Sequence, residues 1–171
     1  QKRRGAVRNS LRAAGDHRNA RPTSSQPLYI HAGAHRTGTS SFQMCLHENR
    51  EVMRAHGFAL AYPRRDGIPS GGLALLLPKP RDQKVGRATV RLTKLLAAYS
   101  GGRPLIMSEE NIPGRMMHFI KGQFYPAAEK RCAVLRAAWP GPIAHVLLVV
   151  RPYEQLFVSG YRKRAEDNRV P

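Results

Sequence analysis

The apolar positions of this chain fall into short continuous runs and longer segments with helical spacing. The short runs predict strands at residues 28–30, 58–62, 105–107 and 144–150. Apolar residues three or four positions apart predict helices at residues 40–57, 87–99, 127–138 and 152–165, the last with Pro152 in its first turn. Strands that alternate with helices in this way predict a three-layer α/β fold with a parallel sheet of about four strands.

The segment 144–150 carries the strongest strand signal, because it is rich in β-branched and apolar side chains. This pattern is typical of a strand buried on both faces. Residues 63–81 combine proline, glycine and basic residues, which predicts a long irregular connection. Residues 1–26 alternate arginine with small and polar residues, so we expect a disordered basic arm before a domain at 27–171.

The composition suits one compact domain, or part of a larger one. The 171 residues are 42% hydrophobic and 23% charged, which excludes wholesale disorder. The longest apolar stretches, 73–77 and 143–150, are shorter than the about 20 residues that span a bilayer, so we expect no membrane span. Cys45 and Cys132 lack metal or redox spacing, which predicts buried free thiols in a reducing compartment and therefore a cytoplasmic protein. The histidines lack zinc spacing, so we expect no metal site.

Charge narrows the class of partner. The chain has 29 Lys and Arg against 11 Asp and Glu, a formal net charge of +18. Such a surplus suits anionic partners, which include nucleic acids, phosphorylated cofactors, acidic glycans and membrane surfaces. The charge by itself does not choose among them.

A glycine-containing loop at residues 31–41 (HAGAHRTGTSS) lies between a predicted strand and a predicted helix. Gly33 and Gly38 have the separation found in the phosphate-binding loop G-x-x-x-x-G-K-S/T, and Ser40 occupies its hydroxyl position. Thr39 stands where that loop has lysine, and the nearest cation is Arg36. The sequence therefore predicts an anion-binding loop at a helix N-terminus. The alternative is an ordinary strand–turn–helix capped by a serine or threonine.

A second polar segment follows the last predicted strand. Arg151 ends that strand, Ser159 comes eight residues later, and Tyr161 lies just beyond. The carboxyl ends of parallel strands meet at one edge of a sheet, so we expect Arg151 and the loop of Arg36 to share one crevice. The alternative is a solvated arginine at a helix start and an ordinary helical serine.

Together the two segments resemble the sulfotransferases that use 3′-phosphoadenosine-5′-phosphosulfate (PAPS). The first resembles that family's 5′-phosphosulfate loop, often H-x-G-x-x-K-T-G-T-T/S-S in bacterial members, so the resemblance implies a bacterial-like protein. The second resembles the family's 3′-phosphate motif. Residues 105–112 (LIMSEENI) also resemble the strand ending in acidic residues of glycan-type members. The resemblance covers residues 27–165. Because the family's domain continues further, we expect this chain to be C-terminally incomplete.

The resemblance implies transfer of a sulfuryl group from PAPS, which leaves as adenosine 3′,5′-bisphosphate (PAP), to a hydroxyl or amine of a small-molecule or glycan acceptor. Arg36 matches the family's usual catalytic lysine, which stabilises the charge that develops on the bridging oxygen as the sulfuryl group leaves, so the resemblance implies a catalytic role for Arg36. A guanidinium keeps the positive charge, but it is not a compact ammonium proton donor. The residues implied to bind the cofactor are His35, Arg36, Thr37, Gly38, Thr39, Ser40, Arg151 and Ser159.

The acceptor needs a general base, and Glu109 is the first candidate because it follows a predicted strand. Glu110, His31 and His35 are the other candidates, and Glu109 could instead cap a helix or pair with an arginine. We expect acceptor contacts from residues 63–81 and 111–125.

Two other functions stay open. A P-loop kinase with a degenerate loop lacks support, because lysine is absent at position 39 and no aspartate follows a strand. A basic nucleic-acid-binding module fits the charge, but aromatic residues are few, at 7%, and form no stacking platform, so we expect no specific nucleic-acid partner. The oligomeric state is left open.

Overall fold

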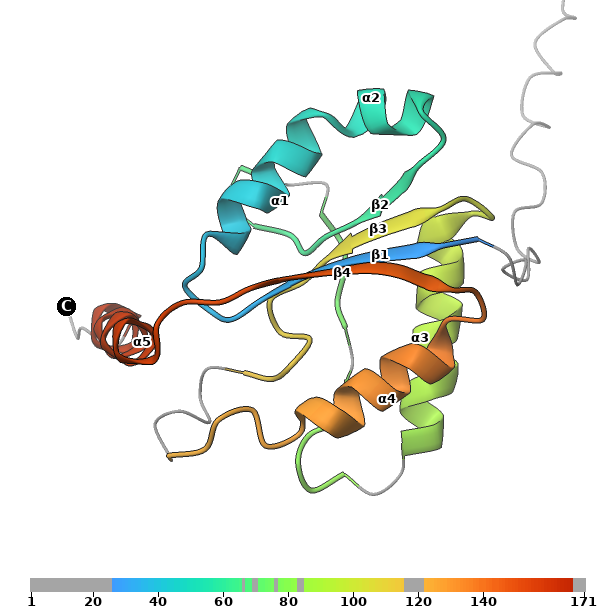
Figure 1. The fold of residues 1–171 in the computed structure, drawn as a ribbon. Coiled ribbons are helices and arrows are strands. Elements are labelled where there is room, and N and C mark those ends of the chain that lie inside the picture. Colours follow the sequence, from blue (N-terminus) through green and yellow to red (C-terminus); the bar gives the residue numbers. More distant parts are fainter. Residues whose placement is uncertain are drawn as a thin grey trace, which may run out of the picture.

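The sheet of this protein contains four parallel strands in the order β2-β3-β1-β4 (Figure 1). The computed structural model describes residues 26–65, 67–68, 71–75, 77–82, 85–115 and 122–167. The strands are β1 (Leu28–Gly33), β2 (Ala59–Ala61), β3 (Leu105–Ser108) and β4 (Ile143–Val149). The predicted α/β fold is confirmed. Residues 1–25 of the predicted basic arm lie outside the described residues.

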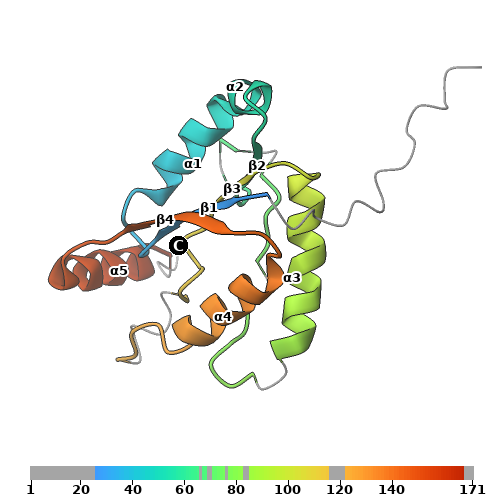
Figure 2. The same ribbon diagram turned by 45° about the vertical axis from the view of Figure 1, so that its right-hand side comes forward.

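Helices cover both faces of the sheet. They are α1 (Thr39–Glu48), α2 (Arg50–Ala55), α3 (Val85–Ser100), α4 (Ala128–Ala138) and α5 (Tyr153–Asp167). The α1–α2 pair lies on one face, and α3 and α4 lie on the other (Figures 1 and 2). None of these helices is long and apolar enough to cross a membrane.

The single helix predicted at 40–57 is in fact two helices that meet at Asn49. The backbone N–H and the side-chain amide of Asn49 both donate to the Cys45 carbonyl, at 3.1 and 2.9 Å. Asn49 itself has φ −93° and ψ 12°, outside the helical region. A local side-chain bond of this kind competes with the helical ladder and ends α1.

The main core lies between the sheet and the α3–α4 layer. Leu28, Leu105 and Met107 from the strands pack there against Leu92 and Leu96 of α3. A smaller cluster lies beneath α1, formed by buried Leu46, Tyr62 and Ile68. The sheet is thus held between two apolar layers, as the predicted three-layer architecture requires.

The expectation that residues 144–150 are buried on both faces is wrong. Val146, Leu147 and Leu148 of β4 are 59%, 53% and 55% exposed. The reason is position: among the described strands, β4 pairs with β1 alone and lies at the edge of the sheet. In addition, α5 continues beyond the end of the sheet instead of returning over it (Figure 1). An apolar run identifies a strand but not its place in the sheet.

The expectation of buried cysteines is also wrong. Cys45 and Cys132 are free, as predicted, but both are exposed. The inward positions of α1 are Thr39, Gln43 and Leu46, so Cys45 lies on a different side of the helix. The spacing of apolar residues alone did not identify which side of α1 faces the sheet.

The chain reverses direction across the sheet between β1 and β3. After β1 the chain passes through α1 and α2 to the β2 side, and after β3 it passes through α4 to the β4 side. The carboxyl ends of β1 and β3 lie next to each other, with His31 of β1 paired opposite Ser108 of β3. In open α/β sheets, ligands bind at the carboxyl ends of the strands at such a reversal. The segments after β1 and β3 therefore border the expected crevice.

Candidate functional site

The loop after β1 makes a tight turn into α1. Arg36 and Gly38 have left-handed φ angles of 70° and 83°. Gly33 lies so close to the loop that an added Cβ would be 2.8 Å from the hydroxyl oxygens of both Thr37 and Thr39. Glycine is therefore required at position 33 by close packing, whereas Gly38 serves the backbone conformation.

The start of α1 lacks the side-chain cap that an ordinary turn would supply. Gly38 is the N-cap residue, and no side chain of the described residues caps the helix. The Thr37 hydroxyl donates instead to the Ala34 carbonyl, at 2.6 Å. The first N–H groups of a helix need acceptors, and the helix dipole favours an anion at this end. The loop therefore has the geometry of an anion site.

A long-range hydrogen bond joins the two segments singled out in the sequence. Arg36 Nε donates to Ser159 Oγ at 2.9 Å, which connects the loop after β1 to α5, 123 residues later. Leu156 of α5 is buried against Ala34 and so holds the helix beside the loop. The structure thus brings Arg36 and Ser159 together.

Arg151 lies at the same edge of the sheet. It follows β4 by two residues, and the Val149 carbonyl accepts the N–H of Ala34 at 3.0 Å. Arg151 is exposed. Among the described residues, its guanidinium has no acidic partner and no hydrogen bond. This cation is available to an anionic ligand.

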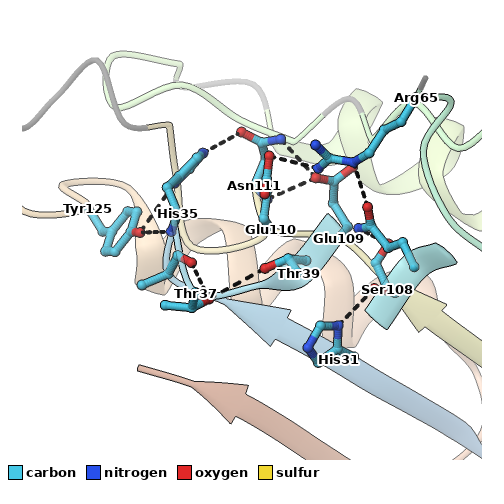
Figure 3. A network of polar contacts seen from close by, with 12 residues as sticks. His31, His35, Thr37, Thr39, Arg65, Ser108, Glu109, Glu110, Asn111 and Tyr125 are labelled. Atoms are coloured by element: carbon cyan, nitrogen blue, oxygen red, sulfur yellow. Dashed lines mark hydrogen bonds and ion pairs between the residues drawn. The ribbon is translucent and has the colours of Figure 1, made fainter. Parts of the chain in front are cut away.

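A polar network connects the ends of β1 and β3 (Figure 3). Asn111 donates to Glu109 Oε1 twice, from its backbone N–H at 2.9 Å and from Nδ2 at 2.8 Å. This orients Asn111 Oδ1 toward His35 Nε2, 3.1 Å away. The network assigns the His35 proton to Nε2, so Nδ1 accepts the hydroxyl of Tyr125 at 3.4 Å.

The sequence analysis included Asn111 and Tyr125 only as the ends of the range 111–125 expected to contact an acceptor, and it did not single out either residue. Asn111 carried a usable signal, because it follows Glu109 and Glu110 in the same predicted turn. Tyr125 had no local signal, since its hydroxyl meets His35 across 90 residues. Burial raises the pKa of Tyr125, which keeps the phenol protonated and able to donate.

The two adjacent glutamates have different environments. Glu109 is 4% exposed, its N–H donates to the His31 carbonyl, and Oε2 has no partner among the described residues. Glu110 forms an ion pair with Arg65 at 2.8 Å. One carboxylate oxygen of Glu109 thus has no partner among the described residues, whereas Glu110 is paired with an arginine.

His31 is an interior residue. It is 4% exposed, its Nδ1 lies 2.8 Å from Ser108 Oγ, and its ring lies 4.1 Å from that of Phe42 between centroids. Burial lowers the pKa of His31 below the ordinary value of 6.5, which favours the neutral ring. Its position under α1 indicates a packing role.

A cleft of about 1150 Å³ opens beside Glu109 and Asn111. It is bordered by residues 74–75 and 77–82, by the first turns of α3, by 109–115 and by 123–131. These include parts of both segments expected to contact an acceptor. The crevice and its polar network therefore have a sizeable neighbouring space.

Buried Arg131 holds two sides of this cleft together. Its guanidinium donates to the backbone carbonyls of Leu77, Pro78, Asn111 and Ile112. Burial, and secondarily the charge of Arg115, lowers the pKa of Arg131. Since the group bonds to four carbonyls, it fixes the 77–78 and 111–112 segments relative to α4.

Within the described ranges, no cluster of three or more His, Cys, Asp or Glu side chains could hold a metal ion. Comparison of the chain with protein-family models, with curated proteins and with solved structures finds no match.

Proposed function

We propose that this chain is a sulfotransferase that takes a sulfuryl group from PAPS and delivers it to a hydroxyl or amine. One observation carries the proposal: the 2.9 Å hydrogen bond between Arg36 Nε and Ser159 Oγ. It joins the segment that resembles a 5′-phosphosulfate loop to the segment that resembles a 3′-phosphate motif. One ligand with anionic groups at both ends fits this juxtaposition.

The donor set suits this cofactor. The loop 34–40 offers backbone N–H groups, three hydroxyls and the Arg36 guanidinium, and it contains no carboxylate. Arg151, which has no acidic partner among the described residues, supplies a second cation at the same edge. Arginine binds phosphate and sulfate oxygens through two parallel N–H groups, so both cations match a doubly anionic nucleotide. When bound, PAPS supplies the sulfuryl group.

The protein's own residues then have distinct tasks. Arg36 stabilises the negative charge of the 5′-phosphosulfate at the loop, and Arg151 and Ser159 bind the 3′-phosphate. Glu109 Oε2 accepts the proton of the acceptor, while Asn111 positions the carboxylate through its two bonds to Oε1. His35 in turn orients Asn111 through Nε2. His35 and Asn111 are positioning residues.

Calorimetric titration tests this proposal against the kinase alternative. We expect PAP to bind more tightly than ATP with Mg²⁺, because the loop lacks the lysine that reaches β- and γ-phosphates. Arg151→Ala should weaken PAP binding by roughly tenfold or more, since a charge-assisted contact to phosphate is lost.

The matched control is Arg54→Ala, which removes an arginine that pairs with Glu51 on α2. It should leave PAP affinity unchanged. Equal affinity for the two nucleotides, or an Arg151→Ala variant that binds PAP normally, would contradict the proposal.

A further inference from the structure

The cleft beside Glu109 has an unusual charge. Six basic residues and two acids lie among its lining residues. Neither acid forms an ion pair with these cations among the described residues: Asp82 accepts the backbone N–H of Lys79 at 2.8 Å, and Glu109 accepts from Asn111, so the basic residues stay in excess. The cleft therefore keeps a positive potential that its own carboxylates do not cancel.

Four exposed arginines supply most of this potential. Among the described residues none of them has an acidic partner, although Arg50, Arg54 and Arg65 elsewhere do. The four are Arg81, Arg87, Arg91 and Arg115.

Two of these four arginines are neighbours on α3. Arg87 and Arg91 are four residues apart, so they lie side by side on one helical face, where like charges weaken a helix. An anion between them would remove this repulsion. Together with Arg115 on the 109–115 border, they place guanidinium groups on two sides of the space next to Glu109.

The lining also limits the kind of anion. None of the described residues that border the cleft is aromatic, so it offers no surface on which nucleic-acid bases could stack. Its volume of about 1150 Å³ is above the usual range for a single small ligand. A hydroxyl-rich chain with several charged groups fits both features.

We propose that this cleft binds an acidic saccharide, whose carboxylate or sulfate groups are held by Arg87, Arg91 and Arg115 while a hydroxyl reaches Glu109. This inference names the acceptor class and rests on the proposed sulfuryl transfer. Arginine forms bidentate bonds with carboxylate and with sulfate, so the two kinds of acidic sugar share one recognition chemistry.

Binding of defined probes to the full chain tests the inference. The probes are a tetragalacturonate, a heparin-derived tetrasaccharide, neutral maltotetraose and a single-stranded oligodeoxythymidine, each titrated with and without saturating PAP. At least one acidic tetrasaccharide should bind with an affinity that falls as salt rises, and maltotetraose should not bind. The two acidic probes distinguish carboxylate from sulfate recognition.

The variant Arg87→Gln/Arg91→Gln should weaken acidic-saccharide binding by roughly tenfold, since two charge-assisted contacts are lost. The control Arg50→Gln/Arg54→Gln removes the same charge from α2, on the opposite face of the sheet, and should change acidic-saccharide binding by less than about twofold (Figure 1). Equal loss in both variants would overturn the inference, as would binding of maltotetraose as tight as that of the acidic probes. The inference is also overturned if Arg87→Gln/Arg91→Gln weakens oligodeoxythymidine binding alone.

PAP titration of the same variants separates the two proposals. Arg87→Gln/Arg91→Gln should bind PAP like the unmodified chain. If PAP fails to bind the unmodified chain, the proposed function fails. The saccharide titrations then test only whether the cleft binds an acidic saccharide.

Discussion

Within the loop that follows β1, two threonine hydroxyls lie against the α-carbon of Gly33. A methyl group at that position would displace Thr37 and Thr39 together, and the loop would lose the shape that directs its N–H groups toward one point. At Gly38 the added methyl would meet nothing within 4 Å, so the only cost there is the left-handed φ of 83°. The same residue type thus serves two different physical purposes in one turn.

His31 gives a prediction about pH. Burial lowers its pKa below 6.5, so folded His31 binds a proton less readily than unfolded His31. The unfolded state therefore gains protons first, and the free energy of unfolding should decrease as pH falls below 6.5. His31→Asn should reduce this dependence in urea titrations over that pH range. His56→Asn, at an exposed position, is the control. If the free energy of unfolding depends on pH equally in His31→Asn and His56→Asn, the dependence does not come from His31.

At the scale of elements, β3 and β4 have similar apolar sequences and different surroundings. β3 lies between β2 and β1, and its Met107 is fully buried, whereas β4 is an edge strand with half-exposed leucines. The free energy that a side chain contributes follows the area removed from water and the contacts it makes.

This difference in burial predicts that shortening a side chain to alanine destabilises the protein more in β3 than in β4. Met107→Ala should lower the free energy of unfolding by about 2–5 kcal/mol, because it leaves a cavity in the main core. Leu148→Ala, at a side chain that is 55% exposed, should lower it by less than about 1 kcal/mol. Urea unfolding followed by circular dichroism measures both. Similar losses for the two variants would mean that β4 is covered in solution.

At the scale of the whole molecule, charge is divided between the first 25 residues and the rest. Removing residues 1–25, with seven basic residues and one acid, lowers the formal net charge from +18 to +12. The described fold begins just after them, at Gln26, whose carbonyl accepts the Trp139 indole N–H at 3.1 Å. The cations of the candidate site all lie after residue 26.

Deletion of residues 1–25 should therefore leave PAP affinity within about twofold of the full chain. Binding of an oligodeoxythymidine should weaken and show a smaller salt dependence, because fewer phosphates are neutralised. Calorimetry for PAP, and fluorescence anisotropy at several salt concentrations for the oligonucleotide, measure the two effects. A deletion that abolishes PAP binding would place part of the nucleotide site in the first 25 residues.

What the sequence determined by itself is local. The strand and helix types, their order, the parallel α/β class and the turn from β1 into α1 follow from side-chain periodicity and from Gly33 and Gly38, which act over a few neighbouring residues. The same local signals singled out Arg36, Glu109, Arg151 and Ser159 as candidates.

Only the tertiary structure decided which of these residues meet. The contact of Arg36 with Ser159 spans 123 residues, and that of His35 with Asn111 spans 76. Both depend on the strand order β2-β3-β1-β4, which also leaves β4 at an exposed edge. Strand order results from packing among distant segments, and no local pattern of side chains encodes it.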